Sequence, residues 1–208
     1  MSEKSTNKYA IVDLEATSAS STACIIQVGI VIMQNGRVID EFASDVNPHQ
    51  KLDNHIVHLT GITDQQLSQA PDFSEIARTI FELIEDCIFV AHNVKFDANL
   101  LAEALFMEGF ELRTPRVDTV ELAQVFYPTL EQYNLSYLSR VLNLDLAQAH
   151  TAIEDARATG KLLLHLMDKI ASLPRQTIDM LLTFSDNLLF ESELVIRDAI
   201  KGKTNSLS

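Results

Sequence analysis

The chain has 208 residues, which is enough for one sizeable domain or for one domain with an appendage. Hydrophobic residues make up 47% of it and charged residues 22%, which excludes a wholly disordered chain, a collagen and a low-complexity linker. No apolar run approaches the ~20 residues that cross a bilayer, so the sequence also predicts no membrane partner.

The charge of the chain is strongly negative. Lys and Arg number 16 against 29 Asp and Glu, which gives a formal net charge of −13. Such a protein repels polyanions at long range, so either its partner is not a nucleic acid or bound divalent cations reverse the sign locally. The two cysteines, Cys24 and Cys87, lie in apolar runs without a CxxC motif. They indicate reduced core thiols in a cytoplasmic protein.

The first part of the chain predicts three antiparallel strands. We expect residues 1–8 to be a disordered N-terminus, because they are polar. Tyr9–Leu14 and Cys24–Met33 are apolar runs of strand length. The dipeptide Asn35-Gly36 is typical of a tight hairpin turn, so Arg37–Ser44 should return as the third strand.

Helices and short strands alternate in the middle of the chain. Asp72 and Glu75 have the spacing of a capping box, and apolar residues follow them at helical spacing. Residues 87–91 are a short apolar run that predicts a central parallel strand. Further elements are a brief strand at 116–119 and helices around 96–107, 120–126, 136–142 and 151–170. This order predicts an α/β domain with a mixed sheet, in which parallel strands follow three antiparallel ones and helices flank both.

Pro174 marks a break near the C-terminus. We expect a core domain over residues 9–172 and a helical extension over 173–208. Within this extension, the sequence predicts one helix from Arg175 to about Ile200. This helix has few residues that could form a separate core. It is either an appended helix or the start of another domain in a longer parent chain.

The first acidic motif lies at the C-terminal end of the first strand. Asp13 and Glu15 are two residues apart, so their side chains project from the same face. Two neighbouring carboxylates repel each other unless a cation lies between them. Two solvated acids at a strand end are the alternative, but the apolar strand that leads into them favours a metal site.

Two further motifs each open a helix. His92-Asn-Val-Lys-Phe-Asp97 follows a buried strand, the position where ligands gather in α/β sheets, although Asp97 alone can serve the helix dipole. His150-Thr-Ala-Ile-Glu-Asp155 starts the long helix, and Asp155 lies beside its apolar stripe. His150 precedes the helix, from where its ring can reach the same carboxylates; a helix cap or a surface residue is the alternative.

Four carboxylates and one histidine thus occur in the order DxE…HNxxFD…HxAxxD. This order resembles the DEDDh exonucleases of the proofreading-subunit (DnaQ-like) superfamily, and the resemblance runs from about residue 9 to residue 170. Leu59-Thr-Gly-Ile-Thr63 also resembles a short motif of that family. Within the superfamily, the chain is most like the exonuclease domain of DinG-type helicases, including the helix at 173–182. It departs from the common first motif, DxETTG, at Ala16 and Ser18.

The resemblance implies a ribonuclease H-like fold and a metal-dependent 3′→5′ exonuclease that releases nucleoside 5′-monophosphates. It implies two Mg²⁺ or Mn²⁺ ions, for which hard oxygen ligands are suited. The implied metal ligands are Asp13, Glu15, Asp97 and Asp155, and the implied general base is His150. The implied substrate contacts are Leu14, Thr17, Thr60, His92, Asn93 and Phe96. For Phe96, helix packing is an equally open alternative.

The implied substrate is the 3′ end of single-stranded DNA. The chain would then be the nuclease domain of a DinG-type helicase or repair protein, with a helicase domain in cis or a polymerase or repair partner. The alternatives are an RNA-trimming or oligoribonuclease-type exoribonuclease, a polymerase III proofreading subunit, a metal phosphoesterase for small molecules and an inactive adaptor with the same fold. Lys95, Arg157 and Lys161 lie near the motifs and can offset the net charge of −13 locally.

Overall fold

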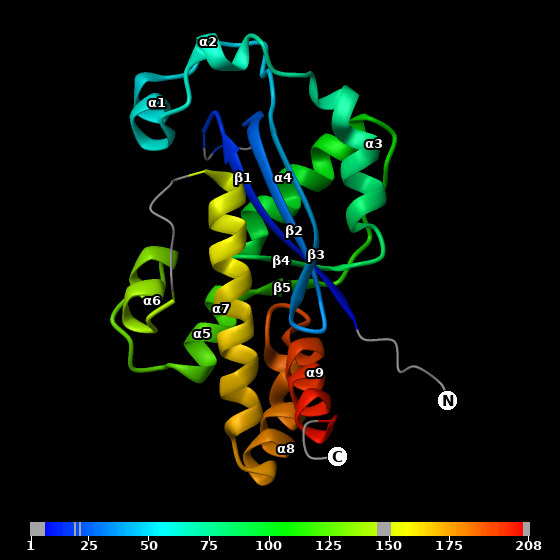
Figure 1. Cartoon of the computed structure of the whole chain (residues 1–208), viewed down its shortest axis with the longest axis vertical. Coiled ribbons are helices and arrows are strands. Elements are labelled where there is room, and N and C mark those ends of the chain that lie inside the picture. Colours follow the sequence, from blue (N-terminus) through cyan, green and yellow to red (C-terminus); the bar gives the residue numbers. More distant parts are fainter. Residues whose placement is uncertain (1–6, 19, 21, 145–150, 206–208) are drawn as a thin grey trace.

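A five-stranded sheet in the order β3-β2-β1-β4-β5 lies at the centre of the computed structural model, which describes residues 7–18, 20, 22–144 and 151–205 (Figure 1). The strands are β1 (Lys8–Ala16), β2 (Ile25–Gln34), β3 (Arg37–Asp45), β4 (Ile88–Ala91) and β5 (Arg116–Asp118). β1, β2 and β3 pair antiparallel, whereas β4 pairs parallel with both β1 and β5. The predicted α/β class and mixed sheet are confirmed.

The N-terminal hairpin forms as its turn residues predict. Asn35 and Gly36 have φ angles of 53° and 71°, the left-handed conformation that a tight two-residue turn requires. The expected disordered segment 1–8 is too long, because β1 already begins at Lys8. Asn7 Nδ2 also donates a hydrogen bond of 2.8 Å to Asp198 Oδ2, which ties the start of the strand to the last helix.

Two helices cover one face of the sheet. They are α3 (Phe73–Ile84) and α4 (Val94–Met107). The predicted capping box is present at the start of α3, where the Asp72 and Glu75 side chains bond to each other's backbone N–H groups. Ile80 and Leu101 are fully buried against the sheet. This face therefore has a core of its own, and α4 is held with its N-terminus at the end of β4.

The other face carries α5 (Thr119–Phe126), α6 (Leu135–Val141) and the long α7 (Ala152–Ser172). α7 crosses β1 and β2 and contacts both (Figure 1). Gly160 faces β2, where a Cβ would lie 2.9 Å from Met33 Sδ near the flexible end of that side chain. Leu162 and Leu166 are fully buried in the resulting core.

Two short helices that the sequence analysis did not predict lie at the end of the sheet where β1 terminates (Figure 1). They are α1 (Asn54–Thr60) and α2 (Asp64–Leu67). α1 buries none of its own residues, so it has no apolar periodicity to detect. A small separate cluster holds the segment in place, and its members are Ile26, Leu52, Ile62 and Leu67.

The C-terminal segment forms two α-helices, not the single helix expected. They are α8 (Arg175–Phe184) and α9 (Ser192–Asn205), joined by a short 3-10 turn at Ser185–Asn187. Glu191 seals the edge of β5, because its N–H donates to Arg116 O at 2.9 Å and its carboxylate accepts from Arg116 N at 2.9 Å. Within the described residues, no helix is both long enough and apolar enough to cross a bilayer.

α9 shares the core of the sheet instead of starting a new one. Val195 and Ile196 are 0% and 1% exposed and belong to the same apolar cluster as α7. We therefore expect Ile196→Ala to lower the free energy of unfolding by about 2–4 kcal/mol in one cooperative urea transition. Leu189→Ala is the matched control, since Leu189 is 86% exposed. A separate early transition that leaves the sheet folded would contradict this prediction.

Candidate active site

Asp13 and Glu15 lie on one face of β1 at its C-terminal end, as the strand period predicts. Both side chains are half-buried. A register shift between Glu15 and Ala16 ends the regular pairing with β2 at this point. Such irregularities re-aim side chains at the ends of strands. The Asp13 and Glu15 carboxylates therefore project in the same direction from the end of β1.

α7 begins directly above this strand end. Thr151 caps the helix, because its hydroxyl accepts from Glu154 N at 3.4 Å. Gln27, which pairs with Glu15 across the sheet, accepts from Ala152 N at 2.8 Å. These contacts set the first turn of α7, which carries Asp155.

Gly29 makes this approach possible. A Cβ at Gly29 would lie 2.2 Å from the backbone carbon of Ala152, a distance at which two carbon atoms cannot pack. The sequence analysis missed Gly29, although an isolated glycine inside an apolar strand is a known sign of close backbone approach. The position of α7, which supplies Asp155, therefore depends on a residue without a side chain at position 29 of β2.

We expect Gly29→Ala to lower the free energy of unfolding by about 1–3 kcal/mol and to move Asp155 away from its neighbours, because the added methyl meets rigid backbone. The matched control is Gly160→Ala, since the Cβ there meets the flexible end of Met33. Urea unfolding and divalent-cation binding measure both effects. Equal behaviour of the two variants would contradict the role given to Gly29.

Asp97 is held at the start of α4. It is 6% exposed, and its Oδ1 accepts from Leu14 N at 3.0 Å, between the two acids of β1. Asn93 precedes the helix in the left-handed conformation, with a φ of 76°. Its N–H donates to Asp118 Oδ1 at 3.0 Å. Asp118, at the end of β5, thus fixes the turn that positions Asp97.

The carboxylates gather closely. Ligand oxygens of Asp13, Glu15 and Asp155 all lie within 4.8 Å of one another. Burial raises the pKa of Asp13 well above its usual range, and the charges of Asp97, Asp155 and Glu15 raise it further. Burial also raises the pKa of Asp97 to about 7, against the opposing effect of the hydrogen bond from Leu14 N.

This donor set fits divalent cations. Three acids within 4.8 Å of one another, with a fourth beside them, are costly without a counter-charge. Carboxylate oxygens are the ligands that hard divalent ions prefer. The predicted metal ligands Asp13, Glu15 and Asp155 are thus brought together, and Asp97 is adjacent to them through Leu14. The predicted base, His150, lies outside the described residues.

Two of the predicted substrate contacts line one cavity. Asn93 and the half-buried Phe96 border a cavity of about 450 Å³ on the flank of α4. The other residues that line it are Ser20, Lys95, Asn99, Leu100 and Glu103. A cavity of this size can accept a nucleotide.

His92 and Leu14, two further predicted substrate contacts, make contacts inside the protein. His92 Nε2 bonds to Tyr133 O at 2.7 Å and Nδ1 bonds to the Thr119 hydroxyl at 2.8 Å, so both ring nitrogens are occupied. Burial lowers the pKa of His92, which favours the neutral ring. The Leu14 side chain is 6% exposed and packs in the core below the carboxylates.

The two predicted threonines hold loops near the site. Thr17 Oγ1 accepts from Cys24 N at 3.0 Å and so closes the loop between β1 and β2. Thr60 Oγ1 donates to Ile56 O at 2.9 Å and accepts from Ile62 N at 3.1 Å at the end of α1. Both hydroxyls therefore bond within the chain.

Known sequences give a consistent match. Residues 10–163 match the family model RNase_T, described as exonuclease. The chain is 38% identical over 185 residues to the 3′-5′ exonuclease DinG of Staphylococcus aureus strain USA300 and also to that of strain NCTC 8325. Each alignment covers 88% of this chain and 21% of the relative. The chain thus spans about a fifth of the length of these relatives.

Solved structures share the fold at low sequence identity. Exonuclease I aligns with a TM-score of 0.71 and 17% identity, over 86% of this chain and 44% of that one. The nuclease domain of 3′hExo, a DEDDh family member, aligns with a TM-score of 0.69 and 16% identity, over 83% and 98%. Exonuclease X, in complex with 5′ overhanging duplex DNA, gives 0.64 and 20%, over 82% and 98%.

The family expected from the separated acidic motifs is therefore confirmed. The matched segment runs from the first strand of the sheet into the long helix that supplies Asp155. On this match, the chain belongs to the RNase_T exonuclease family.

Proposed function

We propose that this chain is a 3′→5′ exonuclease domain that hydrolyses single-stranded DNA. The close approach of Asp13, Glu15 and Asp155, within 4.8 Å, carries the proposal. The relatives named 3′-5′ exonuclease DinG support the direction of hydrolysis. Single-stranded DNA is supported by the shared fold of exonuclease I, one structure of which is a complex with a dA16 oligonucleotide.

The chain would act as the nuclease part of a longer DinG-type helicase or repair protein. It aligns with only 21% of the length of the DinG relatives, so most of each relative lies outside the matched segment. A helicase domain in cis, or a polymerase or repair partner, would bring the 3′ end to the nuclease.

The donor set suits Mg²⁺ or Mn²⁺. Asp13, Glu15 and Asp155 would hold one ion, and Asp97 would help to hold a second. Bound ions of this kind neutralise charge that develops on a phosphate and activate a water molecule for attack. Such neutralisation also explains how a chain with a net charge of −13 can accept a polyanion.

Residues of the chain would orient the terminal nucleotide and move the proton. Phe96 presents a ring at the cavity beside α4, where it can stack on the terminal base. The exposed Asn93 can donate an amide hydrogen bond to sugar or phosphate. His150, just before α7, would accept the proton of the attacking water, because an unperturbed imidazole titrates near pH 6.5.

The test is digestion of 5′-labelled DNA and RNA oligonucleotides of matched sequence with Mn²⁺ or with EDTA. We expect stepwise shortening from the 3′ end, release of nucleoside 5′-monophosphates, faster cleavage of DNA and loss of activity in EDTA. Asp13→Ala should be inactive, and Asp86→Asn, an exposed acid at the opposite end of the sheet, should retain activity.

Each alternative gives a different result. A marked preference for RNA would favour the exoribonuclease, and a strong preference for mismatched 3′ ends would favour the proofreading subunit. Hydrolysis of small phosphodiesters without any action on oligonucleotides would favour the phosphoesterase. Equal residual activity in the wild type and in Asp13→Ala would support the inactive adaptor and contradict the proposed function.

A further inference from the structure

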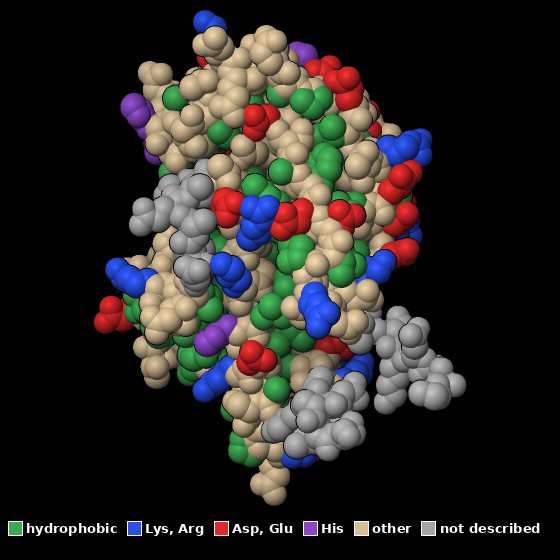
Figure 2. Space-filling model, viewed as in Figure 1, with side chains coloured by type: hydrophobic (Ala, Val, Ile, Leu, Met, Phe, Trp, Pro, Cys, Tyr) green, Lys and Arg blue, Asp and Glu red, His purple; other side chains and the backbone are tan. Residues whose placement is uncertain are grey.

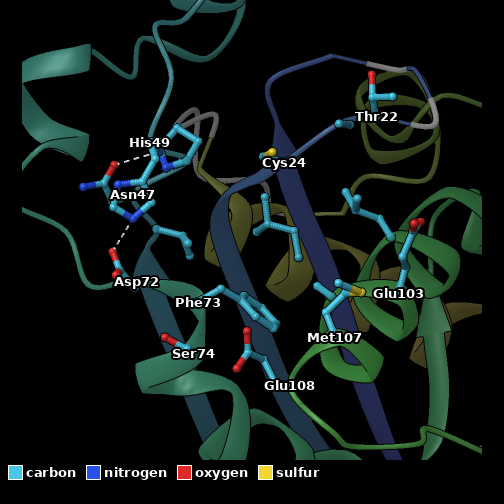
Figure 3. Close-up of a pocket in the computed structure, with 16 residues that line it drawn as sticks. Thr22, Cys24, Asn47, His49, Asp72, Phe73, Ser74, Glu103, Met107 and Glu108 are labelled. Atoms are coloured by element: carbon cyan, nitrogen blue, oxygen red, sulfur yellow. Dashed lines mark hydrogen bonds and ion pairs between the residues drawn. The ribbon is translucent and has the colours of Figure 1, made fainter.

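The flank of α4 is unfavourable for a phosphate backbone. Next to the cavity at Phe96, a second cavity of about 450 Å³ shares Leu100 and Glu103 with it. Figure 3 shows this second cavity, with the acids Asp72, Glu103 and Glu108 among the residues that line it. Among the described residues that line it, the only basic side chain is that of His49, whose Nε2 lies 2.7 Å from Asp72 Oδ1. A strand that left the site in this direction would pass Lys95 and then meet the carboxylates of Glu103 and Glu108.

The flank of α7 is different. Arg157, Lys161, His165 and Lys169 recur every four residues, so they lie along one side of the helix over about 18 Å. Arg157, which pairs with Glu41 and Glu154, starts this series, and Lys161, His165 and Lys169 follow it towards the C-terminal end of α7. Asp168 is the one acidic residue of α7 between Arg157 and Lys169. Figure 2 shows blue and purple side chains on the front of the molecule, where α7 runs.

Aromatic rings lie beside these basic side chains. Lys169 Nζ is 5.5 Å from the centre of the Tyr127 ring, which also stacks on His165 with the ring centres 6.0 Å apart. On the neighbouring α6, the guanidinium carbon of Arg140 is 5.5 Å from the centre of the Tyr137 ring. Cations interleaved with half-buried aromatic rings are the composition of surfaces that bind single-stranded nucleic acid.

We propose that the single strand on the 5′ side of the scissile phosphate leaves the site along α7 and not across α4. The surface it would follow, the basic-aromatic face, consists of Tyr127, Tyr137, Arg140, Lys161, His165 and Lys169. The face begins on the helix that supplies the site, because Asp155 lies on α7 about 9 Å before Lys161 along the helix axis. This inference rests on the proposed function, since it needs a strand whose 3′ end lies at the carboxylates.

The test compares a short and a long substrate. A thymidine dinucleotide reaches only the site, whereas an oligothymidylate of about 20 nucleotides also reaches the basic-aromatic face. For Lys161→Glu/Lys169→Glu we expect KM on the long substrate to rise about tenfold and KM on the dinucleotide to stay within about twofold. The plot of log kcat/KM against log salt concentration should become less steep. The magnitude of its slope should decrease by about 1–2, since each lost phosphate contact removes ~0.7 from that magnitude.

Three further variants make the comparison specific. Arg78→Glu/Arg113→Glu makes the same change in charge on α3 and on the loop before β5. It should leave KM on both substrates unchanged. Glu108→Gln removes charge from the flank of α4 and should not alter KM on the long substrate by more than about twofold. Lys161→Ala/Lys169→Ala should give a smaller increase in KM than the glutamate variant, and it tests the face if charge reversal prevents folding.

Several outcomes would overturn the inference. One is an unchanged KM on the long substrate for both variants of Lys161 and Lys169. Another is an equal loss on both substrates, which would mean that these residues act on the site or the fold. Binding of polyglutamate as tight as that of the long oligothymidylate would assign the face to an acidic protein. Tighter binding of the oligothymidylate by Glu108→Gln would put the strand on α4.

Failure of the proposed function gives a separate result. If wild-type protein with Mn²⁺ hydrolyses neither substrate, the proposed function fails. Fluorescence anisotropy of the labelled long oligothymidylate still tests the face in that case. Weaker binding by Lys161→Glu/Lys169→Glu than by wild type would support it, and equal binding would overturn it.

Discussion

Asp13→Asn is expected to reduce the rate of hydrolysis by about 10³-fold or more and, at the same time, to make the metal-free chain more stable. Both effects come from the same carboxylate. It lies among Glu15, Asp97 and Asp155, whose charges raise its pKa beyond the effect of burial. Removing one negative charge relieves this repulsion, so the free energy of unfolding in EDTA should rise by about 1–3 kcal/mol.

Activity on a labelled oligonucleotide and urea unfolding in EDTA measure the two effects. The matched control is Asp86→Asn, because Asp86 is exposed and lies just before β4, at the opposite end of the sheet. It should change neither quantity. Added Mn²⁺ should stabilise the wild type more than Asp13→Asn, since an ion that binds only the folded chain raises its stability. A less stable Asp13→Asn variant in EDTA would contradict the repulsion inferred here.

The second large effect is the dependence of stability on pH. The pKa of Asp97 is raised from 3.8 to about 7, so the folded chain keeps this proton over a range where the unfolded chain has lost it. Because the folded state then binds more protons, the free energy of unfolding falls as pH rises from about 4 to about 7. At ~1.4 kcal/mol for each pH unit, the contribution of this group reaches an upper limit of about 4 kcal/mol.

Comparison with Asp97→Asn isolates this contribution from the other carboxylates. The asparagine can still accept the hydrogen bond from Leu14 N, but it does not titrate. In EDTA, the stability of the variant relative to the wild type should therefore increase from about pH 4 to pH 7 and then level off. A difference that is constant over this range would show that Asp97 titrates at its ordinary pKa.

Much of the sheet and part of the site could be predicted from local patterns. Alternation along a strand puts Asp13 and Glu15 on one face, and the apolar stripe of α7 places Asp155 beside the core. The turn at Asn35-Gly36 is determined by its own two residues. These features depend on neighbours in the sequence, which is why the pattern is sufficient.

The remaining features depend on contacts between distant segments. Asp118 bonds to the backbone of Asn93 at the start of α4, and Gly29 matters only because α7 approaches it. The break between α8 and α9 has a similar cause. Glu121 accepts from Leu189 N and from the Ser192 hydroxyl, both at 2.6 Å, so a residue of α5 holds the connection. No local period carries such information.

The seal that Glu191 makes on β5 leaves the sheet with one margin open to strand addition. In the part of the chain that the structure describes, β3 hydrogen-bonds to β2 alone, so fibril-like growth or strand exchange between molecules has a single starting place. That margin carries Arg37, Asp40 and Glu41, and charged side chains of this kind disfavour edge-to-edge association. These charged side chains therefore oppose strand pairing between separate molecules, and so oppose aggregation at high protein concentration.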